Sequence, residues 1–492
     1  MTARPISRRQ WLHGSAGLAL AAGATCFLNG RARAQAPATV LTAETRILEV
    51  KGQAAKVYGL TQPDGTAGLE TSLDARFRVV LTNHLAEDTL VHWHGLTPPS
   101  DQDGVPELSQ APLQSGGRYS YDFAIDRPGT YWMHSHVGLQ EQRLLAAPLI
   151  VHNPADARRD EQEPVILLHD FSFKDPEEIL QGLQAVGGGD HARQDGAPSA
   201  QGHMAKPGDA MAKPGDAMAM TMNMDLNDVD FDAYLANDRT LDDPEIIRVE
   251  PGGKLRLRII NAAASTNFQI DLGTLIGTLI AVDGHPVRPV TGTRFEIAIA
   301  QRLDIRVKLP AGQGSYPILA QREGDRLRTG VVLATKSGPI AKLPEASGSP
   351  APPVRLDLER RLRAAVSLPA RPVDRRLNLD LTGSMALYQW SLNGRVYENR
   401  APLMVAAGER VEILMRNQTT MAHPMHLHGH VFQVVSLQGQ RLEGAVRDTV
   451  MVPPKGSVAI AFDADNPGRW AFHCHNLYHM AAGMFTSLEY LS

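Results

Sequence analysis

The chain repeats one pattern of strand and turn three times along its length. Three segments alternate polar and apolar residues, as half-buried β-strands do, and each ends in Asn. They run from Arg76 to Asn83, from Lys254 to Asn261 and from Arg410 to Asn417. A repeat of this kind indicates several copies of one small unit. We therefore expect an all-β protein of three sandwich domains, with short strands, Greek-key connections and Gly/Pro turns.

Histidines follow the first and third copies at the same distances. Each of these copies has a His-x-His pair nine and eleven residues after its final Asn, and the middle copy has apolar residues there. The positions are, in chain order, His92 and His94, Ile270 and Leu272, and His426 and His428. The middle copy is therefore expected to keep the strand scaffold and to lack the metal.

A second histidine pair repeats in the same way. In the first and third copies a Pro-Gly pair is followed, five and seven residues after the Gly, by another His-x-His. These pairs are His134 with His136, and His473 with His475; the same count from Gly314 in the middle copy gives Leu319 and Gln321. Side chains two residues apart on a strand share a face, so both rings of a pair can enter one site. We expect that site between the first and third copies.

The last histidine pair encloses Cys474. One thiolate, two imidazoles and a weak axial thioether are the ligands of blue copper centres. The other candidate ligands are His423 upstream and His479 and Met484 downstream. Because both chain neighbours of Cys474 are histidines, further metal held by them would receive electrons directly from the first centre. That arrangement is typical of an oxidase.

Ten of the eighteen histidines fall in these patterned clusters. A single His-x-His pair is more often a surface feature or a satisfied core pair, but four clusters at matching offsets favour metal binding. We expect the unclustered histidines to lie in the core or on the surface: His84, His152, His169 and His285.

The four clusters resemble the copper motifs of the multicopper oxidases, the family of laccases, ascorbate oxidase and bacterial cuprous oxidases. The resemblance covers nearly the whole mature chain and implies cupredoxin-like domains at residues 40–158, 159–345 and 354–492. The segments Tyr131 to Gln142 and Phe231 to Asn237 are similar to those of periplasmic oxidases of the copper-resistance protein A type.

The resemblance implies four copper ions and assigns their ligands. Type 1 copper takes His423, Cys474 and His479 with Met484 as axial ligand; type 2 copper takes His92 and His426; one type 3 copper takes His94, His134 and His475, and the other takes His136, His428 and His473. His430 completes the sequence pattern but is not a ligand in the family. Imidazoles suit these copper ions, and acceptors on their outer ring nitrogens should fix them.

The mechanism implied is four one-electron oxidations at the type 1 site, with electrons passing through Cys474 to a trinuclear cluster that reduces O2 to two waters. Because this reduction needs four protons, we expect an acid near the cluster. Asp103 matches the family's Asp near the type 2 copper; a simple Asp-Gly turn is the alternative. Some bacterial members have an acid directly after the last type 1 histidine. Met480 stands there in this chain, so that relay is absent or replaced.

The N-terminus has the features of an export signal. A twin-arginine pattern, Ser7 to Leu12, precedes a short apolar run and a small-residue cleavage site at Ala34 to Ala36. We expect residues 1–36 to be a signal peptide, removed after export by the twin-arginine translocase to the periplasm. Removal takes five of the 49 basic residues and none of the 53 acidic residues, so the formal net charge of the mature chain is 44 − 53 = −9. It also removes Cys26, the only possible disulfide partner of Cys474. An acidic mature protein without stable membrane insertion or nucleic-acid binding is expected.

Between residues 187 and 224 the periodicity fails, which predicts a Met-rich insert in the second domain. The sequence Met-Ala-Lys-Pro-Gly-Asp-Ala occurs twice in it. Thioethers favour Cu(I) over Cu(II), so the insert predicts capture of a Cu(I) substrate. Low complexity with methionines packed on apolar surface is the alternative. The candidate sulfurs are those of Met204, Met211, Met218, Met220, Met222 and Met224.

Three functions remain open from the sequence. The first is a cuprous oxidase that converts Cu(I) to Cu(II) in periplasmic copper tolerance. The second is a laccase-like oxidase of phenols or aromatic amines, although an axial Met favours a lower type 1 potential than that of the high-potential laccases. The third, a copper-sequestering protein, is disfavoured because storage does not need a cluster joined to a thiolate. A monomer is expected, because the cluster closes within one chain.

Overall fold

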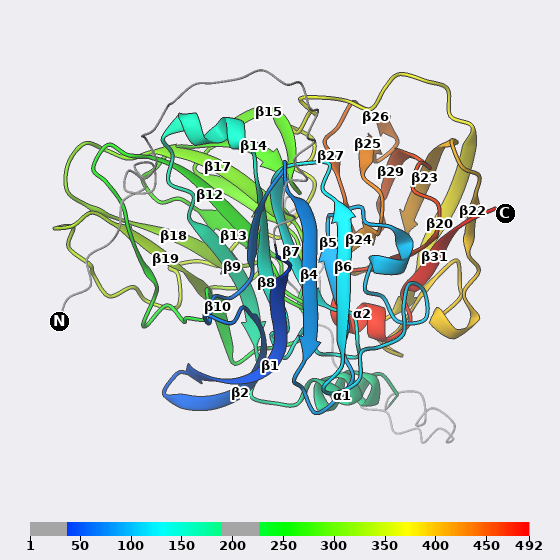
Figure 1. Cartoon of the computed structure of the whole chain (residues 1–492), viewed down its shortest axis with the longest axis horizontal. Helices are drawn as coiled ribbons and strands as arrows, with labels where there is room; N and C mark the ends of the chain where they lie inside the picture. The colour runs from blue at the N-terminus through cyan, green and yellow to red at the C-terminus, as the bar shows by residue number, and fades with distance from the viewer. Residues whose placement is uncertain (1–36, 189–225, 492) are drawn as a thin grey trace, which may run out of the picture. The chain divides into compact units, whose positions relative to one another are not determined.

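The computed structural model describes residues 37–188 and 226–491, and strands make up most of their regular structure (Figure 1). These strands form six sheets, two for each copy of the repeat. The predicted all-β, cupredoxin-like architecture is confirmed. The predicted domain boundaries stay predictions; strands occupy residues 39–152, 165–334 and 375–490.

The first pair of sheets has the strand orders β2-β1-β4-β6 and β3-β8-β7-β5. β1 is parallel to β4 and β3 is parallel to β8, while the other neighbours are antiparallel. Such pairing of strands that are not consecutive is the result of Greek-key connections. Apolar side chains of both sheets form one core between them. The strands are β1 Thr39–Val50, β2 Gln53–Thr61, β3 Leu69–Ser72, β4 Arg76–Asn83, β5 Val91–His94, β6 Arg118–Ala124, β7 Gly129–Ser135 and β8 Ala146–His152.

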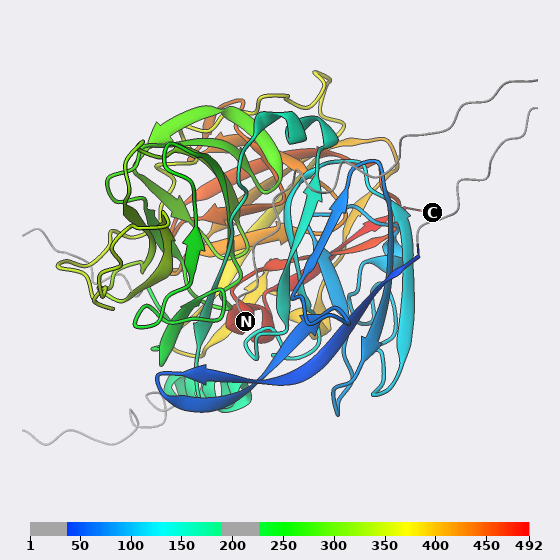
Figure 2. The same cartoon turned by 60° about the vertical axis from the view of Figure 1, so that its left-hand side comes forward.

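The middle pair repeats this plan with additional strands, in the orders β10-β9-β12-β17-β14-β15 and β11-β19-β18-β13-β16. The parallel neighbours are now β9 with β12 and β11 with β19. Green strands in Figures 1 and 2 belong to this pair. The strands are β9 Val165–Phe171, β10 Ala233–Ala236, β11 Ile246–Arg248, β12 Lys254–Asn261, β13 Phe268–Asp271, β14 Gly277–Val282, β15 His285–Gly292, β16 Arg294–Ile297, β17 Arg302–Lys308, β18 Ser315–Arg322 and β19 Arg328–Ala334.

The third pair has the orders β21-β20-β23-β29-β25-β26, with β27 beside β25, and β22-β31-β30-β24-β28. Its parallel neighbours are β20 with β23 and β22 with β31. The strands are β20 Arg375–Ser384, β21 Gln389–Leu392, β22 Leu403–Val405, β23 Arg410–Asn417, β24 His423–Leu427, β25 Phe432–Leu437, β26 Gln440–Arg441, β27 Val446–Arg447, β28 Thr449–Val452, β29 Ser457–Asp463, β30 Arg469–Cys474 and β31 Phe485–Tyr490.

The three strands predicted from the repeat, β4, β12 and β23, have the predicted bounds, and their final Asn residues share one role. Oδ1 of Asn83, Asn261 and Asn417 accepts a hydrogen bond from the backbone N–H two residues later. Nδ2 of each donates to backbone carbonyls of the following loop. The Asn therefore closes the turn that leads from this strand to the next sheet, as Asx turns do.

The middle pair differs from the others in register where the histidines would lie. In the outer pairs His92 is opposite His134 and His426 is opposite His473. In the middle pair Ile270 is opposite Ala320, one residue from Leu319, the position that the repeat makes equivalent. A shift by one residue turns side chains to the other face. Leu319 and Gln321 therefore point away from the face that carries Ile270.

Two α-helices are present in the described residues, α1 Pro176–Gly188 and α2 Leu477–Ala481, with short 3₁₀ turns at Ser100–Gln102, Pro154–Arg159 and Tyr397–Asn399. Helix α1 was not predicted from the sequence, and it continues two residues into the predicted Met-rich insert. The six candidate methionines of that insert lie outside the described residues. Among the described helices, none is long and apolar enough to cross a membrane.

Candidate metal centres

Three donor atoms meet in the third pair of sheets. Sγ of Cys474, at the end of β30, lies 3.6 Å from Nδ1 of His423 and 3.7 Å from Nδ1 of His479, and the two Nδ1 atoms are 3.0 Å apart. All three side chains are fully buried. His423 begins β24 and His479 lies in α2, whose first turn is capped by the Asn476 side chain.

The outer nitrogen of each of these imidazoles has a protein partner. Nε2 of His423 lies 2.8 Å from the hydroxyl of Thr419, and Nε2 of His479 lies 2.8 Å from a carboxylate oxygen of Asp228. These contacts place the ring proton on Nε2 and leave the Nδ1 lone pair toward Cys474. Burial raises the pKa of the Cys474 thiol, so a thiolate here requires a cation in place of the proton.

Met484 and Trp390 adjoin the same cluster. The backbone of Met484 accepts from the N–H of Cys474 at 3.1 Å and donates to the carbonyl of His479 at 3.0 Å. The Met484 side chain is fully buried. The Trp390 ring lies 4.3 Å from the ring of His479 and 5.2 Å from that of His423. Packing thus fixes both imidazoles, and backbone hydrogen bonds hold Met484 beside Cys474 and His479.

The other eight clustered histidines gather between the first and third pairs of sheets. They come from or directly follow β5 and β7 on one side and β24 and β30 on the other: His92, His94, His134, His136, His426, His428, His473 and His475. The structure brings all of them together across more than 330 residues of sequence. Nε2–Nε2 distances are 3.4 Å for His92 and His426, 3.3 Å for His134 and His475, and 3.0 Å for His428 and His473.

Several subsets of this cluster can each surround one ion. The ring nitrogens of His136, His428 and His473 lie within 4.8 Å of one another, as do those of His92, His94 and His134. Nδ1 of His94 and Nε2 of His136 are buried and have no hydrogen-bond partner. Facing nitrogens and unpartnered lone pairs fit metal ions better than they fit a hydrogen-bonded core.

Two aspartates, each through its carboxylate and its backbone carbonyl, hold outer nitrogens of this cluster. The Asp103 carbonyl lies 2.9 Å from Nδ1 of His92, and its carboxylate lies 2.9 Å from Nδ1 of His428. Asp448 accepts from Nε2 of His94 at 3.0 Å through its side chain and lies 2.9 Å from Nδ1 of His426 through its carbonyl. Asp103 is therefore placed, as the sequence suggested, beside histidines from both halves of the cluster.

Burial lowers the pKa of most of these imidazoles and so favours their neutral form. Burial, and then the neighbouring imidazoles, lower the pKa of His94 and His426 well below the usual range. Burial also lowers the pKa of His473 to about 4. Neutral imidazoles are the form that binds metal, so the donor set fits copper or another borderline cation without loss of protons at neutral pH.

Three buried acids that contact the candidate ligands, and an arginine that contacts one of these acids, were not predicted from the sequence: Glu141, Asp228, Asp448 and Arg302. Glu141 lies 2.8 Å from Nδ1 of His134, and burial raises its pKa well above the usual range. It is part of the segment that resembles the copper-resistance oxidases, which was its one available signal. The other three follow no spacing rule relative to the histidines.

The histidines outside the clusters are divided between core and surface, as expected. His169 and His285 are buried, His84 is exposed, and His152 is half-buried between Glu70 and Glu163. His430 is buried and lies 2.7 Å from the hydroxyl of Tyr490. Met480, at the position where an acid was considered, packs against Val105, Leu108 and neighbouring apolar residues.

Known proteins are similar to this chain in sequence and in fold. Profiles described as multicopper oxidase match residues 52–156, 199–337 and 370–491. The multicopper oxidase MmcO of Mycobacterium tuberculosis is 33% identical over 446 residues, which cover 88% of this chain and 82% of that protein. The chain therefore belongs to the multicopper oxidases, a family of copper-dependent oxidoreductases.

Two further relatives show the breadth of the family. A copper resistance protein A homolog of Pseudomonas syringae pv. tomato is 29% identical over 514 residues, covering 83% of this chain and 84% of that protein. The crystal structure of a laccase from Botrytis aclada superposes with a TM-score of 0.71 at 24% identity, covering 92% of this chain and 88% of that one. The second likeness concerns the fold alone.

Proposed function

We propose that this protein is a four-copper oxidase that oxidises Cu(I) to Cu(II) and reduces O2 to water, and that it serves copper tolerance in the periplasm. The main support for this proposal is that the polypeptide chain connects the two clusters directly. Cys474 belongs to the three-donor cluster, while its chain neighbours His473 and His475 belong to the eight-histidine cluster. Bound copper would supply one-electron chemistry at the first cluster and the reduction of O2 at the second.

The geometry supports the ligand sets predicted from the sequence. Type 1 copper is assigned to the three-donor cluster with Met484 as axial ligand, and the type 2 and type 3 ions to the eight histidines. Asp103 is the proposed proton donor, because its carboxylate contacts His428 and its carbonyl contacts His92. A carboxyl group so placed can pass protons to oxygen bound among these histidines.

The surroundings of His479 favour Cu(I) as the reductant. A phenol oxidised directly at a type 1 histidine needs an exposed imidazole edge, but His479 is fully buried and Asp228 covers its Nε2. In the sequence, Asp228 follows Met224, the last methionine of the insert, by four residues. The insert therefore leads, along the chain, directly to the carboxylate that contacts His479.

The name of one relative also supports a role in copper tolerance. Copper resistance is part of the name of the relative from Pseudomonas syringae described above. The twin-arginine pattern and the lone thiol are the basis for proposing export to the periplasm with removal of residues 1–36. A monomer is proposed because all of the candidate ligands come from one chain.

A laccase-like activity toward phenols or aromatic amines is the second candidate. A hollow of about 410 Å³ is lined by Tyr388, Leu387 and the segment 481–483, next to His479 and Met484 in the sequence. Its volume is within the range of small-molecule sites. An aromatic reductant bound there would be close to the type 1 ligands without touching His479.

The test compares oxidation of Cu(I) with oxidation of a simple phenol by the copper-replete protein, with and without residues 203–224. We expect the deletion to impair Cu(I) turnover and to spare phenol turnover. A second variant replaces Met218, Met220, Met222 and Met224 by Leu, which removes the thioethers and keeps similar volume. Met404→Leu, at an exposed position outside the insert, is the matched control. Equal loss of both activities in the deletion would contradict the Cu(I) proposal.

A further inference from the structure

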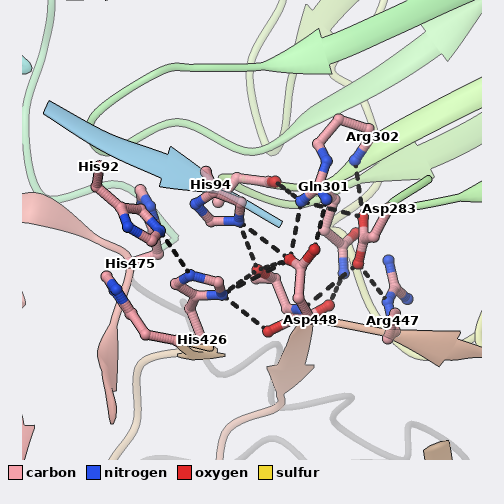
Figure 3. A network of polar contacts seen from close by, with 12 residues as sticks. His92, His94, Asp283, Gln301, Arg302, His426, Arg447, Asp448 and His475 are labelled. Carbon is pink, nitrogen blue, oxygen red and sulfur yellow. Dashed lines mark hydrogen bonds and ion pairs between the residues drawn. The ribbon is translucent and has the colours of Figure 1, made fainter. Parts of the chain in front are cut away.

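A buried ion pair connects the middle pair of sheets to the eight-histidine cluster. Figure 3 shows Asp448 between the imidazoles of His94 and His426 and the guanidinium of Arg302. Nη1 of Arg302 donates to Oδ1 of Asp448 at 2.8 Å, and Nη2 donates to Oδ2. Oδ1 also accepts from Nε2 of His94 at 3.0 Å. One arginine from a pair of sheets that supplies none of the predicted copper ligands thus lies directly behind a histidine of the cluster.

The guanidinium of Arg302 contacts all three pairs of sheets. Arg302 begins β17 of the middle pair, and its Nη1 also donates to the Ala300 carbonyl at 3.0 Å. Nε donates to the carbonyl of Thr130 in β7 of the first pair at 3.2 Å. Asp448 precedes β28 of the third pair. The planar donor fork of arginine is fixed by these acceptors, which a lysine cannot reproduce.

Asp283 accepts hydrogen bonds from Arg302 and from Arg447, the residue before Asp448. It lies in the turn between β14 and β15, and its Oδ1 accepts from the backbone N–H of Arg302 at 2.9 Å. Its Oδ2 accepts from Nε of Arg447 at 2.8 Å. Arg447 is the residue before Asp448 and is held in turn by Glu359. Asp448 is therefore restrained through its own carboxylate and through the preceding residue.

Gly95, directly after His94, lies against the Arg302–Asp448 ion pair and leaves no room there for a side chain. Its φ is +91°, and a Cβ there would collide with Nη2 of Arg302 and lie 2.8 Å from Oδ2 of Asp448. Any side chain at position 95 would push the guanidinium and the carboxylate apart. The Gly of the His-Trp-His-Gly sequence thus leaves the space that the ion pair occupies.

We propose that Arg302 is a positioning residue for the trinuclear copper site: it holds Asp448, and Asp448 orients His94 with Nδ1 free for copper. The copper-free middle pair of sheets thereby determines how tightly the cluster holds its metal. This inference rests on the proposed trinuclear assignment. Hydrogen-bond partners of metal-bound histidines contribute about 10–100-fold to metal affinity.

The experiment measures copper retention by Arg302→Lys in the full-length, copper-loaded protein. Lysine keeps the charge but not the two-point contact with Asp448. Competition with a copper chelator, followed by metal analysis, is expected to show about 10–100-fold weaker retention of the trinuclear ions. The type 2 EPR spectrum should change because His94 and His426 both depend on Asp448. The type 1 absorption should not, because His423, Cys474 and His479 lie outside this network.

Two further variants separate positioning from general destabilisation. Arg256→Lys alters another buried Arg–Asp pair of the same sheet, in which Arg256 contacts Asp304 at 2.5 Å, and it should leave copper retention unchanged. Asp283→Asn weakens the support of Arg302 without touching a candidate ligand. It should cause a smaller loss of retention with the same EPR change. If Arg302→Lys does not fold, copper retention by Asp283→Asn tests the proposal in its place.

Each outcome has one meaning. Wild-type retention in Arg302→Lys, or in Asp283→Asn where the first variant does not fold, overturns the proposal. Equal copper loss in Arg256→Lys overturns it too, because destabilisation alone would then explain the effect. A wild-type protein that lacks the type 2 EPR signal, or holds fewer than four copper ions, refutes the proposed function itself. The two failures are therefore distinguishable.

Discussion

Oδ2 of Asp228 lies 2.8 Å from Nε2 of His479, and both side chains are fully buried. The hydroxyl of Tyr388 donates to the same carboxylate oxygen at 2.7 Å. Burial alone would raise the pKa of Asp228, but His479 and the Tyr388 hydroxyl lower it, so the group stays ionised. A residue just after the Met-rich insert thus places a negative charge against a candidate type 1 ligand.

Asp228→Asn is expected to raise the type 1 reduction potential, because a negative charge beside the site favours the oxidised ion. The rise should be about 60 mV if the carboxylate contributes ~1.4 kcal/mol. A redox titration followed by the blue absorption measures it. Tyr388→Phe keeps the charge and should shift the potential less. An unchanged potential in Asp228→Asn would show that the contact has no electrostatic role.

Cys474→Ser should remove the blue absorption and abolish oxidation of either reductant, while the protein stays folded. The change replaces one buried atom, and the hydroxyl is a poor ligand for type 1 copper. Metal analysis should give one copper ion fewer, with the type 2 EPR signal retained. Loss of all copper would contradict the separation of the two clusters.

Asp103→Asn should lower the rate of O2 consumption by about 10²–10⁴-fold, the usual contribution of a positioned proton donor. The amide preserves the shape of the side chain and can still accept a hydrogen bond from His428, so copper content should be unchanged. Oxygen uptake and metal analysis on the same sample test both statements. If Asp103→Asn turns over normally and only Asp103→Ala fails, Asp103 orients histidines and donates no proton.

The ion pairs of His152 make part of the stability pH-dependent. Hydrogen bonds to Glu163 and Glu70 raise the pKa of His152 to about 9, above its unfolded value of 6.5. The contribution of these ion pairs to the free energy of unfolding is therefore complete below pH 6.5 and is lost as the pH rises through 9. His152→Gln should cost about 1–2 kcal/mol at pH 6, after allowance for solvent screening, and little at pH 10. Urea denaturation at both pH values tests this; an equal loss at both would contradict it.

Ile270→Ala should lower the free energy of unfolding by about 2–5 kcal/mol, as cavities in a core do. Ile270 occupies the position that holds a histidine in the outer copies, but it is part of an apolar core. Copper content and the type 1 absorption should not change. Denaturation and metal analysis of one preparation suffice, and loss of copper would show that the middle core is coupled to the cluster.

Local rules predicted much of this protein from its sequence. The strands that end in Asn83, Asn261 and Asn417 have the predicted bounds, because alternation on a half-buried strand and the Asn turn are both local features. Helix α1 was missed because it borders a low-complexity segment. The register shift opposite Ile270 was missed because the pairing of two strands depends on the loops and cores around them, not on spacing within one strand.

The sequence by itself determined the candidates for the chemistry: the ten clustered histidines, Cys474 and Met484 follow from residue type and spacing. Only the tertiary structure decided which acids support them. Asp228 reaches His479 and Asp448 reaches His94 from distant parts of the chain, whereas Glu141 reaches His134 from seven residues away through the turn after β7. Their role depends on burial and on contacts between sheets. A carboxylate acquires such a role only where folding excludes water and brings an imidazole or a guanidinium within hydrogen-bonding distance.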